Sequence, residues 1–370
     1  MNVYGKISRF HFQLCRFVVF FVAASASFAG FYAKWSFIDP DRFPDEPGMR
    51  QITFDKMMDG TAARPFVYRR LIPDIANALN DRLPALRRWL AQPLPQSGIS
   101  RLQVLVNCPM TRDPRYAFRY GVVYALTFLF ALAAPYALSA VCRIAGASIS
   151  SSLLVPVVVM LIFPYVTTHG GYFYDYAELF FMAAALAICW RFGPAWTVPI
   201  VMLAAWNKES FPVFLPSLYP FLSIRFNRLN AVLWNIGLIV ATVPVCLWTH
   251  LRFHANSGGT VAVEWRQQLH WLATPRLWLT DREVTYAMLT PQALTILPIA
   301  VLALTVWGGW RYLPPICRQH VQVAAAVNLP LYVFFCNPGE MRNLSLLWMS
   351  FLFLAVFLLQ SWERTPSAAV

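Results

Sequence analysis

The amino-acid sequence predicts an all-α fold, a polytopic transmembrane helical bundle with about ten spans. Of the 370 residues, 58% are hydrophobic and only 13% are charged, and the mean hydropathy is +0.50. A soluble domain cannot bury that much apolar surface. Apolar stretches of nearly the length needed to cross a bilayer, about 20 residues, recur along the chain. We therefore expect one integral membrane domain over residues 1–370.

Nine apolar stretches define the expected spans. Eight are each read as one helix: Leu14–Ala33, Ala117–Val141, Ser150–Val166, Ala177–Phe192, Asn230–His250, Ala293–Trp310, Val321–Cys336 and Asn343–Trp362. The ninth, Ala195–Ile224, is too long for one plain span and is interrupted by Asn207, Lys208 and Glu209. We expect two short helices that meet there near one membrane face.

Basic residues in alternate short connections orient the chain. They are Lys6, Arg9, Arg16, Arg143, Arg191, Arg225, Arg228, Arg311 and Arg318, and no acid shares these connections. Cytoplasmic loops are rich in Lys and Arg, so both termini are expected in the cytoplasm and the protein in a bacterial inner membrane. The net charge of +13 then needs no nucleic-acid partner, since no basic stripe interleaved with aromatic residues is present.

The first apolar run poses one alternative. Basic residues precede it, and Ala24–Ser27 resembles a signal-peptide cleavage site. Because the run continues through Phe28, Phe31 and Tyr32, we expect an uncleaved membrane anchor.

The sequence predicts no metal or cofactor. The seven cysteines form no CxxC pair, and the six histidines are scattered. His250 and His254 are four residues apart but have no plausible further ligand nearby.

Two long outer, periplasmic loops are predicted, over residues 34–116 and 251–292. In the first, an apolar stripe with helical spacing predicts a helix on the membrane surface, formed by Ile72, Ile75, Leu79, Leu83, Leu86 and Leu90. Pro84 should bend or split that helix. In the second, Trp265, Trp271 and Trp278 indicate an interfacial segment.

Four outer connections bring ionisable and aromatic residues to one side of the membrane. The first loop carries Asp39, Asp41, Asp45, Glu46 and Asp59, then Arg64, Tyr68, Arg69 and Arg70; the later connections carry Tyr174, Asp175 and Glu178, then Lys208 and Glu209, then Glu340 and Arg342. Ionisable groups at membrane depth are costly and usually pair or line a cavity. We expect a wet cavity that opens outward.

Each motif also has a plainer interpretation. The acids of the first loop are more often a solvated surface, its arginines can bind lipid headgroups, and the aromatic run near Tyr174 can be an interfacial belt. Glu340 with Arg342 can be an ion pair at a helix start. Lys208 and Glu209 are the hardest to explain structurally, because they interrupt an apolar segment.

The residue types suit a lipid-linked phosphate substrate. The planar guanidinium of Arg makes paired hydrogen bonds to phosphate, and a nearby carboxylate can act as a general base on an acceptor hydroxyl. Tyr and Trp faces suit sugar rings. There is no P-loop or GxGxxG sequence for a nucleotide donor.

This layout resembles the GT-C glycosyltransferases, in particular bacterial members that use polyprenyl-phosphate sugars. The segments Met57–Thr61 and Arg64–Pro73 are similar to a segment of bacterial polytopic proteins linked to surface-polysaccharide formation. The resemblance implies a lipid-linked sugar donor, a glycan or lipid acceptor, and membrane lipids as surroundings. It implies a catalytic acid in the first outer loop. Asp59 and Asp41 are the leading candidates for this role, for which Asp39, Asp45 and Glu46 also compete. The remaining assignments are phosphate-side cations at Arg64, Arg69 and Lys208, shaping residues at Asp175, Glu209 and Glu340, and further substrate contacts at Tyr68, Tyr174, Glu178 and Arg342.

Two other classes share these features. A transporter or flippase would also have broken helices and buried charge, and Ala195–Ile224 could form a discontinuous helix pair. A non-catalytic partner in polysaccharide assembly would tolerate the loss of single outer polar residues. Sugar transfer by the purified protein separates the enzyme from both.

Overall fold

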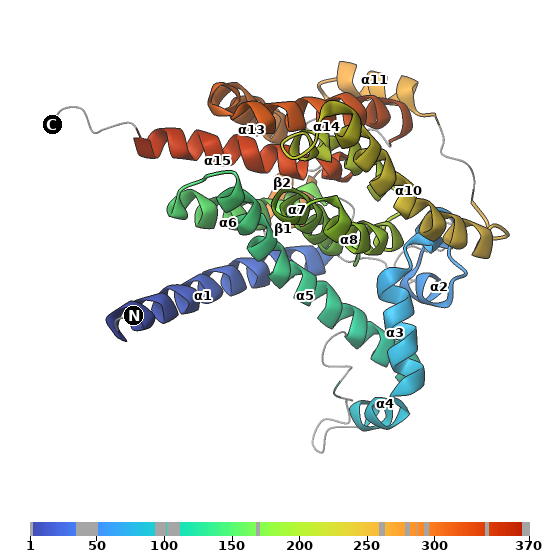
Figure 1. Ribbon diagram of the computed structural model, residues 1–370. Helices are drawn as coiled ribbons and strands as arrows, with labels where there is room; N and C mark the ends of the chain where they lie inside the picture. The colour runs from blue at the N-terminus through green and yellow to red at the C-terminus, as the bar shows by residue number, and fades with distance from the viewer. Residues whose placement is uncertain are drawn as a thin grey trace.

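A computed structural model shows a bundle of helices with one short hairpin (Figure 1). It describes residues 3–34, 51–92, 101, 112–167, 171–258, 263–277, 282–286, 288–291, 296–336 and 340–364. The expected sites at Asp39, Asp41, Asp45, Glu46 and Trp278 lie outside the described residues.

The helices follow the expected stretches closely. The long ones are α1 (Val3–Lys34), α5 (Pro114–Ile144), α6 (Ile149–Val166), α7 (Asp175–Phe192), α8 (Pro194–Asn207), α10 (Arg228–Arg252), α13 (Ile296–Gly309), α14 (Pro315–Phe335) and α15 (Trp348–Arg364). The shorter ones are α2 (Phe54–Asp59), α3 (Leu71–Arg82), α4 (Pro84–Ala91), α9 (Tyr219–Leu222) and α11 (Trp265–Ala273), with 3-10 turns η4 (Phe66–Tyr68), η7 (Phe211–Leu218), η8 (Trp310–Tyr312) and η9 (Met341–Leu347).

Local sequence explains where several helices begin and end. The side chains of Asp113, Ser148 and Asn227 accept backbone N–H groups in the first turns of α5, α6 and α10. Gly193 adopts a left-handed φ of 94° between α7 and α8, and Pro194 then opens α8. The predicted break in the ninth stretch falls after Asn207, where α8 ends.

Five helical segments are long and apolar enough to cross a membrane among the described residues, which marks the chain as a membrane protein. They are Phe10–Phe31, Pro114–Ile144, Ile149–Val166, Arg228–Arg252 and Met341–Glu363. The other expected spans form shorter or less apolar helices. The α10 helix has large apolar side chains on its outer face, as a membrane-spanning helix would. The exposed residues are Leu233, Ile236, Val240, Leu247 and Leu251.

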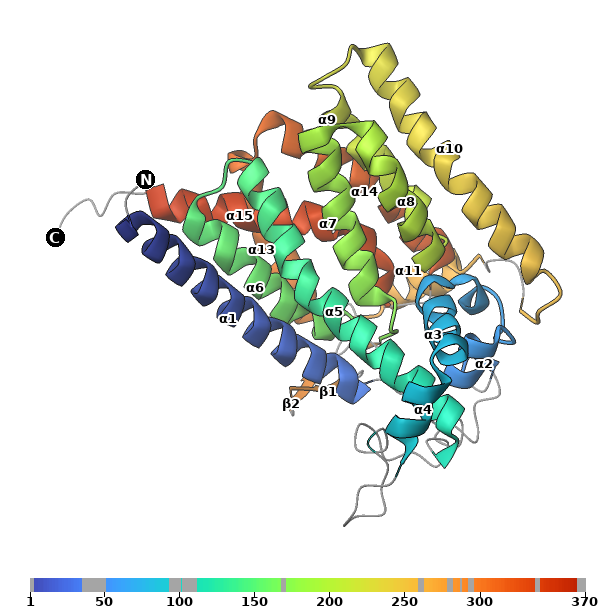
Figure 2. The same ribbon diagram turned by 60° about the horizontal axis from the view of Figure 1, so that its bottom comes forward.

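The bundle has two distinct ends (Figure 2). At one end, Ser148 before α6 donates a 2.6 Å hydrogen bond to Glu363 near the end of α15. Arg225, after α9, donates to the carbonyl of Trp190 near the end of α7, over 3.0 Å. The connections α5–α6, α7–α8 and α9–α10 all lie at this end of the bundle (Figure 2). The opposite end collects the start of α7 and the end of α8, beside which α2 and α3 pack.

The described part of the first long loop packs against that opposite end. Pro84 splits its predicted helix into α3 and α4, as expected. Ile72 is buried and Leu79 packs on Ala117 and Phe118 of α5, but Leu83 remains exposed. The apolar stripe therefore faces protein in α3 and turns outward near the proline.

The described part of the second long loop adds one short hairpin to the all-α fold. Residues Arg282–Thr285 (β1) and Met288–Pro291 (β2) form an antiparallel hairpin. β-Branched residues such as Val284 and Thr285 favour a strand. Tyr286, at the turn, donates to the carbonyl of Leu161 in α6 over 3.0 Å, which ties the hairpin to the bundle.

Candidate functional site

Seven ionisable side chains gather where α7 begins, α8 ends and η9 leads into α15. We call them the polar cluster: Arg69, Asp175, Glu178, Lys208, Glu209, Glu340 and Arg342. They come from four segments far apart in the sequence, and six of the seven are at most 12% exposed. All seven are among the predicted site residues, so the structure brings the four outer connections together.

Arg69 follows η4 and reaches into the cluster from the first loop. Its Nε and Nη2 donate to the two carboxylate oxygens of Glu209, with donor–acceptor distances of 3.3 Å in both bonds. Its Nη1 donates to the hydroxyl of Tyr174. The guanidinium also lies over the rings of Tyr174 and Phe66, 4.5 and 4.8 Å from their centroids. Burial lowers the pKa of Arg69, but Glu209 and Tyr174 outweigh it and raise the pKa overall. Arg69 is therefore a permanent cation.

Two arginines enclose a pair of stacked tyrosines. The rings of Tyr172 and Tyr174 lie 5.0 Å apart and are inclined by 12°. Arg69 covers Tyr174, and Arg342 covers Tyr172 at 4.3 Å. Burial raises the pKa of Tyr172 to about 12, although the nearby Arg342 and Arg69 lower it. Both phenols therefore stay protonated, and the stack presents rigid aromatic area between two positive charges.

Arg342 and Lys208 each have a carboxylate of their own. Arg342 donates from Nη2 to Glu340 over 2.6 Å. Lys208 donates from Nζ to Glu178 over 2.7 Å, and Ser345 donates to the other oxygen of Glu178 over 3.0 Å. The Lys208–Glu178 pair is buried, so the loss of either partner would leave the other charge unpaired in apolar surroundings, at a large cost in free energy.

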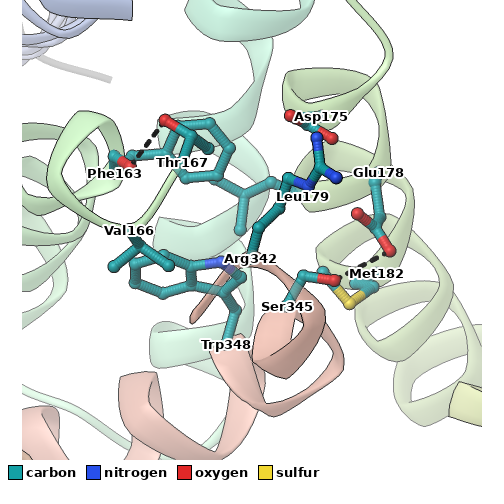
Figure 3. Close-up of a pocket in the computed structure, with 10 residues that line it drawn as sticks. All are labelled: Phe163, Val166, Thr167, Asp175, Glu178, Leu179, Met182, Arg342, Ser345 and Trp348. Carbon is teal, nitrogen blue, oxygen red and sulfur yellow. Dashed lines mark hydrogen bonds between the residues drawn. The ribbon is translucent and has the colours of Figure 1, made fainter. Parts of the chain in front are cut away.

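Asp175 differs from the other three acids of the cluster. Its Oδ2 accepts the backbone N–H of Tyr172 over 2.7 Å, which fixes the carboxyl at the start of α7. Its Oδ1 is buried without a hydrogen-bond partner among the described residues. Figure 3 shows the guanidinium of Arg342 directed toward this carboxyl from η9, with no hydrogen bond between them.

The expected wet cavity that opens outward stays a prediction. Among the described residues, a cavity of about 10 Å³, with room for about one water molecule, lies at the cluster. Its polar lining is Thr167, Asp175, Glu178, Arg342 and Ser345 (Figure 3). Arg342 lines this space from η9, and Phe163 and Trp348 contribute aromatic rings to its apolar lining. Glu209 is the more exposed partner of its ion pair, at 17% of its side chain.

Several predicted site residues lie outside the cluster. Asp59, 45% exposed, ends α2 and pairs with Arg119 of α5. Arg64 donates to the carbonyl of Gly258 over 2.5 Å. Tyr68 stacks on His250 of α10 with ring centroids 4.1 Å apart.

Arg70 links the helix that carries Asp59 to the segment that carries Arg69. Arg70 follows Arg69 directly and donates to the carbonyl of Met57 over 2.6 Å and to Asp74 over 2.6 Å. It thereby holds α2 against α3 beside the segment that carries Arg69. Asp59 lies within electrostatic reach of Arg70 on that flank.

Sequence reasoning missed three residues of this region. Tyr172 stacks in the cluster, Ser345 completes the bonding of Glu178, and Arg119 anchors Asp59. A signal existed for Arg119, since an arginine one turn inside a long apolar helix needs a partner. No comparable signal marks Ser345.

Among the described residues, no group of three or more His, Cys, Asp and Glu side chains is placed to hold a metal ion. The cluster instead offers fixed cations, aromatic faces and carboxylates. Comparison with protein-family models, characterised proteins and solved structures finds no match to the chain.

Proposed function

We propose that the protein is a membrane glycosyltransferase of the GT-C type. In this proposal it transfers a sugar from a polyprenyl-phosphate-linked donor to a cell-surface glycan or lipid acceptor, at the periplasmic face of a bacterial inner membrane. One observation carries the proposal: two arginines from separate segments lie over a pair of stacked tyrosines, and a third cation, Lys208, is buried with Glu178 in the same cluster at one end of a membrane bundle.

The cations suit the phosphate of the donor. Arg69 and Arg342 present planar guanidinium groups, which bind phosphate through paired hydrogen bonds. Both now bond a carboxylate, so a phosphate would have to replace Glu209 or Glu340 as the acceptor. Glu209 is the easier to displace, because its 3.3 Å bonds are longer than the 2.6 Å bond of Glu340.

The aromatic and acidic groups suit the rest of the reaction. The stacked rings of Tyr172 and Tyr174 lie between Arg69 and Arg342 and so hold the two guanidinium groups in place for a phosphate. A first-loop carboxylate would accept the proton of the acceptor hydroxyl as that oxygen attacks the sugar carbon and the lipid phosphate leaves. Asp59 and Asp41 stay the candidates for this base.

The proposed topology has ten spans, with both termini in the cytoplasm. The separation of the basic connections from the polar cluster, at opposite ends of the bundle, supports it. Lys and Arg favour cytoplasmic connections, so the cluster end would face the periplasm.

The test is sugar transfer by purified protein from a polyprenyl-phosphate sugar. Arg69→Lys should weaken donor binding roughly 10–100-fold, because a charged hydrogen bond of about 1.5–3 kcal/mol is lost with the guanidinium fork. Arg88→Lys is the matched control, since Arg88 is an exposed residue of α4. It should behave as wild type.

The same assay tests the base. Asp59→Asn, or Asp41→Asn if Asp41 is the base, should leave donor binding intact and slow transfer by about 10²–10⁴-fold. If neither variant slows transfer and no other first-loop carboxylate matters, the proposed mechanism fails.

A transporter or flippase is the second candidate. The closure of the polar cluster by its own ion pairs favours it, because such closure is typical of an occluded state. Movement of an intact lipid-linked substrate across vesicles by the wild-type protein, without chemical change, would replace the enzyme with this function.

A further inference from the structure

The charges of the polar cluster do not balance. It contains three cations, Arg69, Lys208 and Arg342, each bonded to one acid, Glu209, Glu178 and Glu340 respectively. Asp175 is the fourth acid and has no cation bonded to it. With every group ionised, the described cluster would hold one negative charge in excess.

Asp175 is the least favourable place for that charge. It is only 2% exposed, and burying an ionised carboxylate without a paired charge is very costly. The charged groups that face it are Arg342 from η9, Lys208 after α8 and Glu178 from its own helix. Both cations are already neutralised by closer acids, while Glu178 repels a second negative charge.

The two oxygens of Asp175 have different surroundings. Oδ2 accepts the N–H of Tyr172 and must keep its lone pair for that bond. Oδ1 has no partner among the described residues, and Asp175 is one of the residues that line the cavity of about 10 Å³ (Figure 3). A protonated Oδ1 would donate to a water molecule there. That water would have Ser345, Thr167 and Glu178 as further polar neighbours.

We propose that Asp175 is a proton-binding site, in which Oδ1 carries a proton at neutral pH and donates it to one water molecule in the cavity. The proton removes the excess charge of the cluster and satisfies the orphaned oxygen in one step. The inference rests on the charge count and the cavity, and it holds for either proposed function.

Infrared spectroscopy of the full-length protein in lipid nanodiscs tests the proposal. A carboxylic-acid C=O stretching band should be present at pH 7 and should shift in D₂O, because the proton exchanges through the water. Asp175→Asn should abolish this band. Glu363→Gln, the same kind of change at an exposed acid outside the cluster, at the other end of the bundle, should leave it in place.

A labelling experiment covers the case in which Asp175→Asn does not fold. Wild-type protein with carboxyl-¹³C aspartate should show the band at a lower frequency, whereas carboxyl-¹³C glutamate should not move it. A band that survives Asp175→Asn unchanged, a band that moves only with glutamate label, or no band at pH 7 would each overturn the proposal.

Discussion

The Lys208–Glu178 pair should be strongly coupled in stability. The Nζ and Oε2 atoms are 2.7 Å apart, and the side chains are 10% and 2% exposed. At an effective dielectric constant of about 20, two unit charges at this distance attract by roughly 6 kcal/mol. Desolvation opposes that attraction, so the useful quantity is the effect of removing one partner.

Lys208→Met should lower the free energy of unfolding by about 3–5 kcal/mol, because it leaves Glu178 charged and buried with only Ser345 as a donor. Glu178→Gln should also destabilise, because Lys208 loses its counter-charge. The double variant should recover about 2–3 kcal/mol of the summed losses, since neither charge then remains alone.

The free energies can be measured by denaturant titration in mixed micelles, with all four proteins under the same conditions. Glu363→Gln is the control: Glu363 is exposed at the other end of the bundle, and its loss should cost less than about 1 kcal/mol. Additivity of the two single changes to within about 0.5 kcal/mol would refute the buried pair.

Three further predictions concern neighbouring positions. Gly171→Ala should destabilise by at least about 2 kcal/mol, because φ is +42° and a Cβ would come within 2.3 Å of the Phe31 ring; an unchanged melting temperature would contradict this. Tyr174→Phe should keep the ring stack but leave one N–H of Arg69 unbonded, at a cost of about 1–3 kcal/mol, which thermal unfolding would detect or disprove. Arg225→Cys, in a background without other cysteines, should react with an impermeant thiol reagent only after cell lysis; labelling of intact cells would invert the topology.

Helix positions were largely predictable from the sequence. A helix satisfies its own backbone hydrogen bonds, so an apolar run long enough to cross a bilayer predicts a helix over roughly the same residues. The break before Lys208 and the split at Pro84 were predictable for similar local reasons, a charge in an apolar segment and a missing N–H. The hairpin at Arg282–Thr285 was missed, because its stability depends on packing against α1 and α6 and not on a strong local pattern.

The sequence by itself also determined which residues needed an explanation. Asp175, Lys208 and Glu340 stand out because an ionisable group at the end of an apolar segment is expensive unless it is paired. That free-energy cost depends on the ionisable side chain and on the apolar residues next to it in the sequence, so it can be predicted without a tertiary structure.

Only the tertiary structure decided which cation pairs with which carboxylate. Arg69 bonds Glu209 across 140 positions of the chain, and Glu178 bonds both Lys208 and Ser345. Asp59 instead pairs with Arg119, outside the cluster. Partners are set by the way helices pack in space, and the spacing of residues along the chain carries no information about contacts between distant helices. For the same reason, the excess acid at Asp175 became visible only once the pairs were known.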